Sequence, residues 1–339
     1  MSDAAIATKD DGRPDQEAER RRGSTLTTVL LRQETTLIFV IVVIGVLTTV
    51  RNSSFSSRAN ITAIASASVI YFVMACGASL ITIGGGLDFS VGVVFTLGGL
   101  VCGWMLVHGV AWPLAVLIGV GVGALAGIVN NCVIVYLHVP PIIATLGTFF
   151  VGTGISTTIT GGNDIVPLPS SFQKLGQGEL VGVPYVVWYA IAVGAAFWFA
   201  LEKTRFGINV RALGGNRQAA IGNGLRVGRL DFALYILGGG TAALAGVIYA
   251  AQVGSGQVEA GGPTTTLNVV TAVLIGGVSL FGGLGTITGV AVGAILLSEI
   301  DNALIVASIP PQYNTIIIGS ILICAVAIDH VRRKRLYRQ

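Results

Sequence analysis

The chain has 339 residues, of which 53% are hydrophobic and 11% are charged, and its formal net charge is +4. Its mean hydropathy is +0.80. Soluble proteins carry about 25% charged residues, so this composition excludes a water-soluble globular protein. No alternating apolar segments of about ten residues repeat along the chain, which argues against an outer-membrane barrel. The sequence therefore predicts an all-α, polytopic membrane protein.

Residues 1–33 form a charged tail without aromatic residues, which predicts a disordered cytoplasmic segment. The apolar stretch at 35–50 follows this tail. It has no small-residue cleavage site, and Arg51 lies just beyond it, so a cleavable secretory signal is not expected. We therefore interpret residues 35–50 as the first membrane span.

Turn residues and charges divide the predicted membrane domain, residues 34–331, into apolar stretches long enough to be crossings at about 20 residues each. Two of these stretches contain an Ile-Gly-Gly element, at 83–85 and at 275–277, which suggests two structurally similar halves. About ten spans are expected, at 35–50, 59–83, 88–107, 112–137, 142–160, 184–201, 231–253, 267–281, 286–307 and 313–330.

Basic residues test this count through the positive-inside rule. Six of them lie between the sixth and seventh spans, in a loop at about 202–230, and five lie in or next to the basic tail at 332–339. Both regions are cytoplasmic if the chain starts inside. The loop at 161–183 is then external, and both termini lie on the cytoplasmic side of the membrane.

Several kinds of chemistry are absent from the sequence. No lysine follows a glycine, so the chain has no phosphate-binding loop for ATP. The three histidines lie far apart and form no metal-ligand pattern. Few carboxylates lie near the predicted spans, namely Asp88, Glu299 and Asp301. They give only weak support to transport coupled to an ion gradient. We expect no enzyme activity, no metal, no cofactor in this chain, and no nucleic-acid partner.

The most informative segment is ITIGGGLDFSVGVVFTLGG, at 81–99. Three glycines interrupt a helix, and Asp88 and Ser90 begin the next one, where their oxygens can cap exposed amides. A helix broken at membrane depth must be buried in protein or line a cavity. Asp88 and Ser90 are thus either helix caps at a membrane boundary or part of a solute path.

Four motifs, in this order, carry a resemblance to a known family. They are GGGLDFSVG at 84–92, Asn130 followed by VPPIIATLGT at 139–148, TRFGINVRALGGNRQAA at 204–220, and LNVVTAVLIGGVSLFGGLGT at 267–286. Over about residues 35–330 the chain resembles the permease subunits of ribose, xylose and arabinose-type ABC importers.

That resemblance implies a ten-span permease of the vitamin B12 importer type (type II), paired with a second, identical or different, permease subunit. Both would lie in the lipid bilayer of a bacterial cell (inner) membrane. An extracellular or periplasmic binding protein would deliver a monosaccharide, and a cytoplasmic ATPase subunit would bind ATP and Mg²⁺. The segment at 204–220 resembles the coupling helix that docks on the ATPase, although its basic residues also serve as a positive-inside anchor. The candidate coupling residues are Arg205, Gly207, Arg211, Gly214, Gly215 and Asn216.

Further candidates for the solute path are Asn130, Thr145, Thr148 and Asn268. An amide in lipid needs a partner, so we expect Asn130 or its neighbour Asn131 to face another helix or the path. The two threonines share a helix face, but we favour bonds to their own helix carbonyls. Where the family commonly has Glu-Leu-Asp this chain has Thr-Leu-Asn at 266–268, and Thr153 replaces a common arginine. Both replacements remove charge and weaken the transfer of a particular sugar.

The predicted external loop offers a contact for the binding protein through Asn163, Asp164 and Lys174, or is a plain connector. Other solutes remain open for this architecture: a nucleoside, a polyol, a furanosyl signal or a branched-chain amino acid. An ion-coupled secondary transporter is the rival from another class, and it would depend on Asp88.

Overall fold

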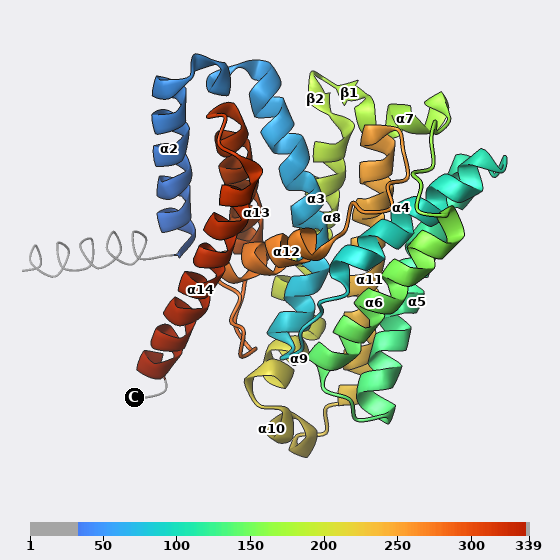
Figure 1. The fold of residues 1–339 in the computed structure, drawn as a ribbon. Helices are drawn as coiled ribbons and strands as arrows, with labels where there is room; N and C mark the ends of the chain where they lie inside the picture. Colours follow the sequence, from blue (N-terminus) through green and yellow to red (C-terminus); the bar gives the residue numbers. More distant parts are fainter. Residues whose placement is uncertain (1–32, 337–339) are drawn as a thin grey trace, which may run out of the picture.

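A computed structural model describes residues 33–336 of the chain, and the tail predicted at 1–33 lies outside the described residues apart from Gln33. The described chain is almost entirely helical (Figure 1). Its main helices are α2 (Gln33–Arg51), α3 (Arg58–Ile83), α4 (Val91–Val107), α5 (Trp112–Tyr136), α6 (Pro141–Thr160), α8 (Tyr185–Lys203), α11 (Val227–Val253), α12 (Pro263–Ile275), α13 (Ile287–Val306) and α14 (Pro311–Leu336). The last helix continues through residues 332–336, which the sequence assigned to a tail.

Each predicted span corresponds to one of these helices. Seven helices in the described part of the chain are long and apolar enough to cross a membrane, and α4, α12 and an apolar part of α14 are shorter. The largest difference concerns α12, which was expected at 267–281 but ends at Ile275 and has 13 residues. Figure 1 shows α12 lying across the direction of α3 and α13 instead of alongside them. At about 1.5 Å per residue α12 is about 20 Å long, shorter than the hydrocarbon core of a bilayer.

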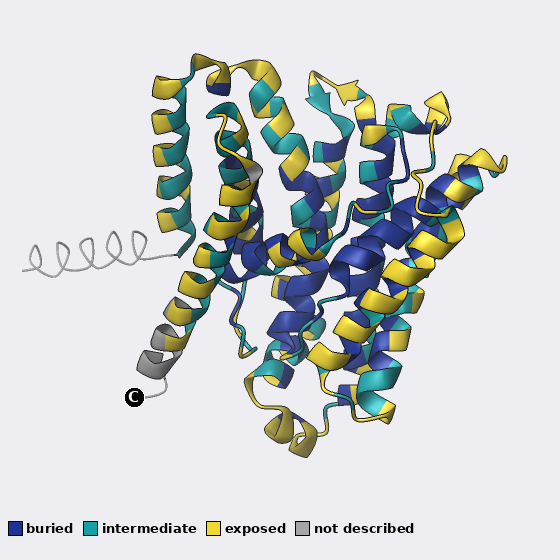
Figure 2. Cartoon of the chain, in the orientation of Figure 1, coloured by how far each residue is buried: buried dark blue, intermediate teal, exposed yellow. Residues whose placement is uncertain are grey.

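The core lies where α11 packs against α3, α4 and α5 (Figure 2). Glycines bring these helices into backbone contact. A Cβ atom on Gly123 would lie 2.2 Å from the carbonyl oxygen of Gly239, and one on Gly98 would lie 2.5 Å from the Cα of Ala243. Membrane helices associate through such close contacts because lipid provides no hydrophobic driving force between them.

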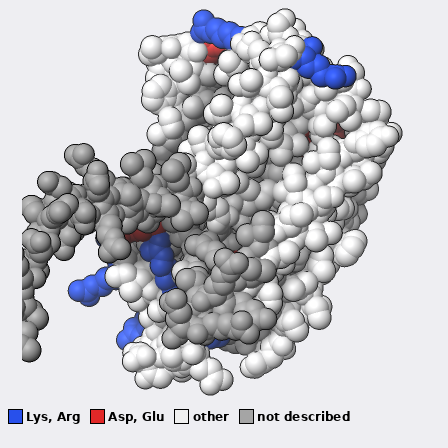
Figure 3. Space-filling model, turned by 90° about the vertical axis from the view of Figure 1, so that its left-hand side faces the viewer, with Lys and Arg blue, Asp and Glu red and all other residues white. Residues whose placement is uncertain are grey.

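At the periphery, α2 and α14 flank α13. Helix α2 has no buried residue, and its exposed side chains are mostly apolar, as expected for a surface in contact with lipid. Its first residues are fixed to the rest of the protein. Gln33 Nε2 donates to the carbonyl of Ile275 at 2.8 Å, and Glu34 accepts from the Thr286 hydroxyl at 3.1 Å. Figure 3 shows Lys and Arg mainly toward the two ends of one face, with a mostly white surface between them.

The two Ile-Gly-Gly elements end their helices in the same way. After α3, Gly84 and Gly85 donate to the carbonyls of Leu80 and Thr82, and after α12 the amides of Gly276 and Gly277 make the equivalent bonds. Gly85 and Gly277 have φ angles of 86° and 89°, which glycine adopts without strain. The elements end the first helix of one predicted half and the second helix of the other, so they mark a shared helix ending and not equivalent positions of two repeats.

Two loops contain secondary structure. The sequence analysis predicted none in the first of them, whereas in the second it expected a coupling helix at 204–220. The loop after α6 holds α7 (Ser170–Gln177) and a two-residue hairpin of β1 (Glu179–Leu180) and β2 (Val183–Pro184). The loop after α8 holds α9 (Arg205–Gly215) and α10 (Arg217–Gly222). Figure 1 places α7 and the hairpin at the upper end of the molecule and α9 with α10 at the lower end. The short 3-10 helix η1 (Ser53–Ser56) connects α2 to α3 at the upper end.

Candidate functional site

The first group of candidate residues forms one chain of hydrogen bonds, which we call the Asp88 network: Asp88, Ser90, Asn130 and Thr148. Asp88 Oδ1 accepts from the backbone N–H of Ser90 at 2.7 Å and from its hydroxyl at 2.5 Å. Asn130 Nδ2 donates to Ser90 Oγ at 2.9 Å, and Thr148 Oγ1 donates to Asn130 Oδ1 at 2.5 Å. The network therefore joins the break after α3 to α5 and α6.

Geometry bears on both interpretations of Asp88. Its carboxylate closes a local turn with Ser90, but the Ser90 side chain makes no capping bond to α4. Asp88, Ser90 and Asn130 are all buried, at 8%, 0% and 1% exposure, and Thr148 is half-buried. A buried amide and carboxylate persist in an apolar core only when they are hydrogen-bonded, and here the Asp88 carboxylate and the Asn130 amide both bond to Ser90. The result is a preformed polar strip that ends at Thr148, at the edge of the protein interior.

Thr145 contacts the same region from α6. Its hydroxyl oxygen accepts from the N–H of Phe89 at 3.1 Å, and the hydroxyl donates to the carbonyl of Pro141 at 2.9 Å. The favoured interpretation, a bond to its own helix, thus holds for Thr145 alongside a contact to the helix break. Asn131 is fully buried, and neither atom of its side-chain amide has a partner within the described residues.

Asn268 lies in a different cluster from the Asp88 network. Its Nδ2 donates to the Tyr71 hydroxyl at 3.0 Å, and that hydroxyl lies 3.4 Å from Asp301 Oδ2. The cluster connects α12, α3 and α13. The sequence analysis noted Asp301 as a carboxylate near a span but did not connect it with Tyr71. No spacing signal could have done so, because 197 residues separate Tyr71 from Asn268.

The coupling candidate Gly214 occupies a contact of four glycines, which we call the glycine junction: Gly85, Gly214, Gly282 and Gly283. A Cβ atom on Gly214 would lie 1.8 Å from the Ile83 carbonyl oxygen and 2.6 Å from the Gly283 amide nitrogen. The N–H of Gly283 donates to that same carbonyl at 2.8 Å. The end of α9 thus touches both helix breaks, the one after α3 and the loop that follows α12.

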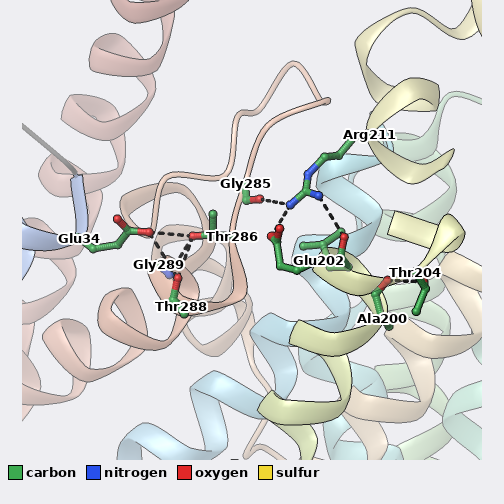
Figure 4. Close-up of polar contacts among 10 residues, drawn as sticks. Glu34, Ala200, Glu202, Thr204, Arg211, Gly285, Thr286, Thr288 and Gly289 are labelled. Atoms are coloured by element: carbon green, nitrogen blue, oxygen red, sulfur yellow. Dashed lines mark hydrogen bonds and ion pairs between the residues drawn. The ribbon is translucent and has the colours of Figure 1, made fainter. Parts of the chain in front are cut away.

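Arg211 extends this contact (Figure 4). Its guanidinium donates to the carbonyls of Leu201 at 3.0 Å and Gly285 at 3.4 Å, and it pairs with Glu202. Arg211 therefore ties α9 to the end of α8 and to the loop before α13, within the chain itself. Figure 4 also shows Glu34 of α2 reaching the threonine at the start of α13.

The remaining coupling candidates divide into packed and exposed positions. Gly207 is buried against Leu201, where a Cβ atom would lie 1.8 Å from the carbonyl oxygen. Gly215 has open space around it, and Arg205 and Asn216 are exposed. Asn216 caps α10 by accepting from the N–H of Ala219 at 3.0 Å. The exposed members leave one face of α9 and α10 free for a partner.

In the predicted external loop, Asp164 and its neighbours are bound to the segment after α11. Asp164 Oδ1 accepts from the N–H of Val258 at 2.9 Å, and Ile165 forms a two-bond bridge with Gly256. The Asn163 side chain donates to the carbonyl of Gly161, its backbone N–H donates to the carbonyl of Thr160, and Lys174 on α7 is exposed. Through the bonds of Asp164 and Ile165, the loop fixes the position of the segment at 254–262.

No catalytic constellation accompanies these groups. Within residues 33–336, no three His, Cys, Asp or Glu side chains lie close enough to hold a metal ion. The arrangement consists of hydroxyls, amides and carboxylates at helix breaks. Such groups can bind and pass a polar solute.

The chain matches a family described as the permease component of the branched-chain amino acid transport system, over residues 60–326. The autoinducer 2 import system permease protein of Salmonella paratyphi B is 32% identical over 287 residues, which cover 85% of this chain and 83% of that protein. The D-allose transport system permease protein of Escherichia coli K12 is 31% identical over 292 residues, covering 86% and 89%. No solved structure matches this chain.

Proposed function

Since this chain belongs to the family of permease components of branched-chain amino acid transport systems, we propose that it forms the transmembrane path for a monosaccharide, a pentose or a hexose, in an ATP-driven importer. It is an ABC permease of the sugar and autoinducer 2 importer type, as the resemblance implied, and such permeases are transport subunits and not enzymes. ATP and Mg²⁺ belong to a separate ATPase.

The Asp88 network is the observation that carries the solute path. Four polar side chains from the break after α3, from α5 and from α6 are held together in the membrane-embedded part of the protein. Hydroxyl and amide groups exchange hydrogen bonds with sugar hydroxyls at little cost, because they already satisfy one another. Asn268, in its separate cluster with Tyr71, would contribute from α12.

The glycine junction supports a coupling role for α9. An ATPase that moves α9 would displace both helix breaks together, because Gly214 contacts the Ile83 carbonyl and Gly283 at the same point. Arg205 and Asn216 are exposed for docking, whereas Arg211 acts inside the permease by holding α9 to α8. This extends the sequence interpretation by separating residues that touch the partner from residues that transmit its motion.

We assign the end of the molecule with α9 and α10 to the cytoplasm, and with it both chain termini. Arg205, Arg217, Arg226 and Arg229 all lie there, in agreement with the positive-inside rule. The ten main helices would then form the permease domain at 34–331, in the architecture of the vitamin B12 importer, paired with a second permease subunit. The loop with Asn163, Asp164 and Lys174 would meet an extracellular binding protein.

Other solutes suit the same architecture. A nucleoside, a polyol, a furanosyl signal or a branched-chain amino acid would use the same helices with a different binding protein, and one relative is named for autoinducer 2. An ion-coupled secondary transporter would depend on Asp88 as an ionisable carrier. In the Asp88 network that carboxylate is engaged with Ser90, which favours a positioning role.

Purification of the tagged chain in mild detergent from its native host tests the proposal. Recovery of an ATPase subunit and a binding protein that binds a monosaccharide would support it. A chain that purifies alone, and takes up solute into liposomes with an ion gradient and no ATP, would overturn it. In that case Asp88→Asn would abolish uptake, whereas in the importer ATP-driven uptake would persist at a reduced rate.

A further inference from the structure

One non-helical segment, residues 254–262, runs along the side of α4. Near its start, a Cβ atom on Gly256 would lie 3.3 Å from the carbonyl oxygen of Gly99. Near its end, the N–H of Gly261 donates to Thr96 Oγ1 at 2.8 Å, and a Cβ atom on Gly261 would lie 1.8 Å from the Gly92 carbonyl oxygen. These contacts follow α4 from Gly99 to Gly92, so the segment descends beside the helix.

This placement puts the segment at membrane depth. Helix α4 is apolar and has 17 residues, Val91–Val107. At about 1.5 Å per residue, Gly99 lies about 12 Å from the outer end of α4 and Gly92 about 22 Å from it. Backbone without helical hydrogen bonds is tolerated at such depth only where it is buried in protein or lines a water-filled cavity.

Glu259 lies between these two contacts. Its side chain is exposed in this chain, and it makes no hydrogen bond or ion pair with the described residues. Thr264, in the first turn of α12, is also exposed, and the N-cap of that helix is Gly262, which has no side chain to cap the first amides. An unpaired carboxylate and the amino-terminal end of α12 therefore lie close together in the sequence, and Glu259 and Thr264 are both exposed.

A carboxylate in this position cannot face hydrocarbon without a large cost, about 2.5 to 3.5 kcal/mol even on lenient scales. The helix start beside it favours a negative charge. A water-filled path satisfies this carboxylate, whereas lipid does not. The backbone beside it is held by protein, since Gly256 bonds to Ile165, Val258 to Asp164 and Gly261 to Thr96.

We propose that Glu259, together with Thr264, lines the water-filled solute path and accepts hydrogen bonds from the hydroxyls of a neutral polyhydroxylated solute. The proposal rests on the proposed permease function and adds a binding position to it. The two carboxylate oxygens can accept from adjacent hydroxyls of one sugar, and charged acceptors form the stronger hydrogen bonds. Asp164 would hold this position in place, because it binds the N–H of the preceding Val258.

Access to water can be measured without knowing the solute. We would introduce Glu259→Cys into the full chain, in membranes, and follow its reaction with a charged, membrane-impermeant methanethiosulfonate by site-resolved mass spectrometry. Val181→Cys, at the 90% exposed tip of the hairpin, is the water-exposed control, and Leu125→Cys, on the 57% exposed apolar surface of α5, is the lipid-facing control. Native Cys76, which is buried, is an internal reference.

We expect the residue-259 variant to react at least about tenfold faster than the residue-125 variant, since thiolates form in water and not in hydrocarbon. A rate equal to that of the lipid-facing control would overturn the proposal, whatever the protein transports. This outcome is independent of whether the chain works with an ATPase, so it separates a failure of this inference from a failure of the proposed function.

Recognition of the solute is tested next, in proteoliposomes containing the intact importer with labelled D-allose, D-ribose and D-xylose as probes. Glu259→Gln keeps the size of the side chain and removes the charge, whereas Glu259→Asp keeps the charge. We expect the glutamine variant to lower the uptake rate of the transported sugar about tenfold, as for loss of a charged hydrogen bond, with the aspartate variant in between. Equal uptake by the wild type and the glutamine variant would overturn the binding role, and so would transport of none of the three sugars by the wild type.

Discussion

Gly214→Ala offers the sharpest test of how α9 is connected to the rest of the permease. The added Cβ atom would lie 1.8 Å from the Ile83 carbonyl oxygen and 2.6 Å from the Gly283 amide nitrogen, whereas ordinary contacts begin at 3.4 Å. The backbone of α9 or of the break after α3 would have to move by roughly 1.5 Å to restore van der Waals contact. That movement would also stretch the 2.8 Å hydrogen bond from Gly283 to Ile83. Overpacking and the weakened hydrogen bond together predict a loss of about 2 to 4 kcal/mol in the free energy of unfolding.

The neighbouring position provides a matched control. Gly215 follows directly in α9 and has no atom within 4 Å of an added Cβ. Gly215→Ala should change the free energy of unfolding by less than about 1 kcal/mol, because only the helix propensity changes. Both variants would be unfolded reversibly in mixed detergent micelles, and the ratio of solute uptake to ATP hydrolysis would be measured in the reconstituted importer. We expect Gly214→Ala to lower this ratio and Gly215→Ala to leave it unchanged. Identical behaviour of the two variants would refute the glycine junction as the connection.

Three further substitutions test other contacts. Thr96→Val should destabilise the protein by about 1 to 3 kcal/mol, since the buried N–H of Gly261 loses its acceptor; unchanged thermal stability would show that water replaces the hydroxyl. Asn130→Ala should cost a similar amount and slow uptake, because it opens the Asp88 network at its centre; normal uptake would remove the network from the path. Arg217→Gln should cost about 1 to 3 kcal/mol, because it leaves the buried carboxylate of Asp231 without its charged partner; unchanged stability of the variant would contradict this.

Sequence patterns predict the helix boundaries well where prolines and glycines begin or end a helix. Pro140 is the N-cap of α6 and Pro141 its first residue, and glycines follow α3, α6 and α11. These residues act locally, through a fixed φ angle or access to positive φ, so their effect needs no knowledge of the rest of the fold. For the same reason, the break containing Asp88 could be located from the sequence.

Contacts between residues far apart in the chain have no such local signal in the sequence. Hydropathy predicts that α12 crosses the membrane. The hydropathy of an apolar segment is the same whether the helix crosses the membrane or lies within it, so it does not report the helix direction. Only its packing between α3 and α13 fixes its direction. The target of Arg211 is likewise set by three-dimensional proximity, since Gly285 lies 74 residues further on. The role proposed for Glu259 depends on its position along α4, and no local sequence pattern indicates that position.

The glycine contacts among α4, α5 and α11 have a mechanical consequence. Where Gly123 meets Gly239 and Gly127 meets the Tyr235 carbonyl, backbone touches backbone and no side chain lies between to change its rotamer. If one of these helices slid or rotated, larger side chains next to the glycines would clash with the backbone of the facing helix. The three helices therefore move together as a rigid body. Any alternation between open and closed forms must take place at more loosely packed boundaries, such as those of α2 and α14, which border a large cavity.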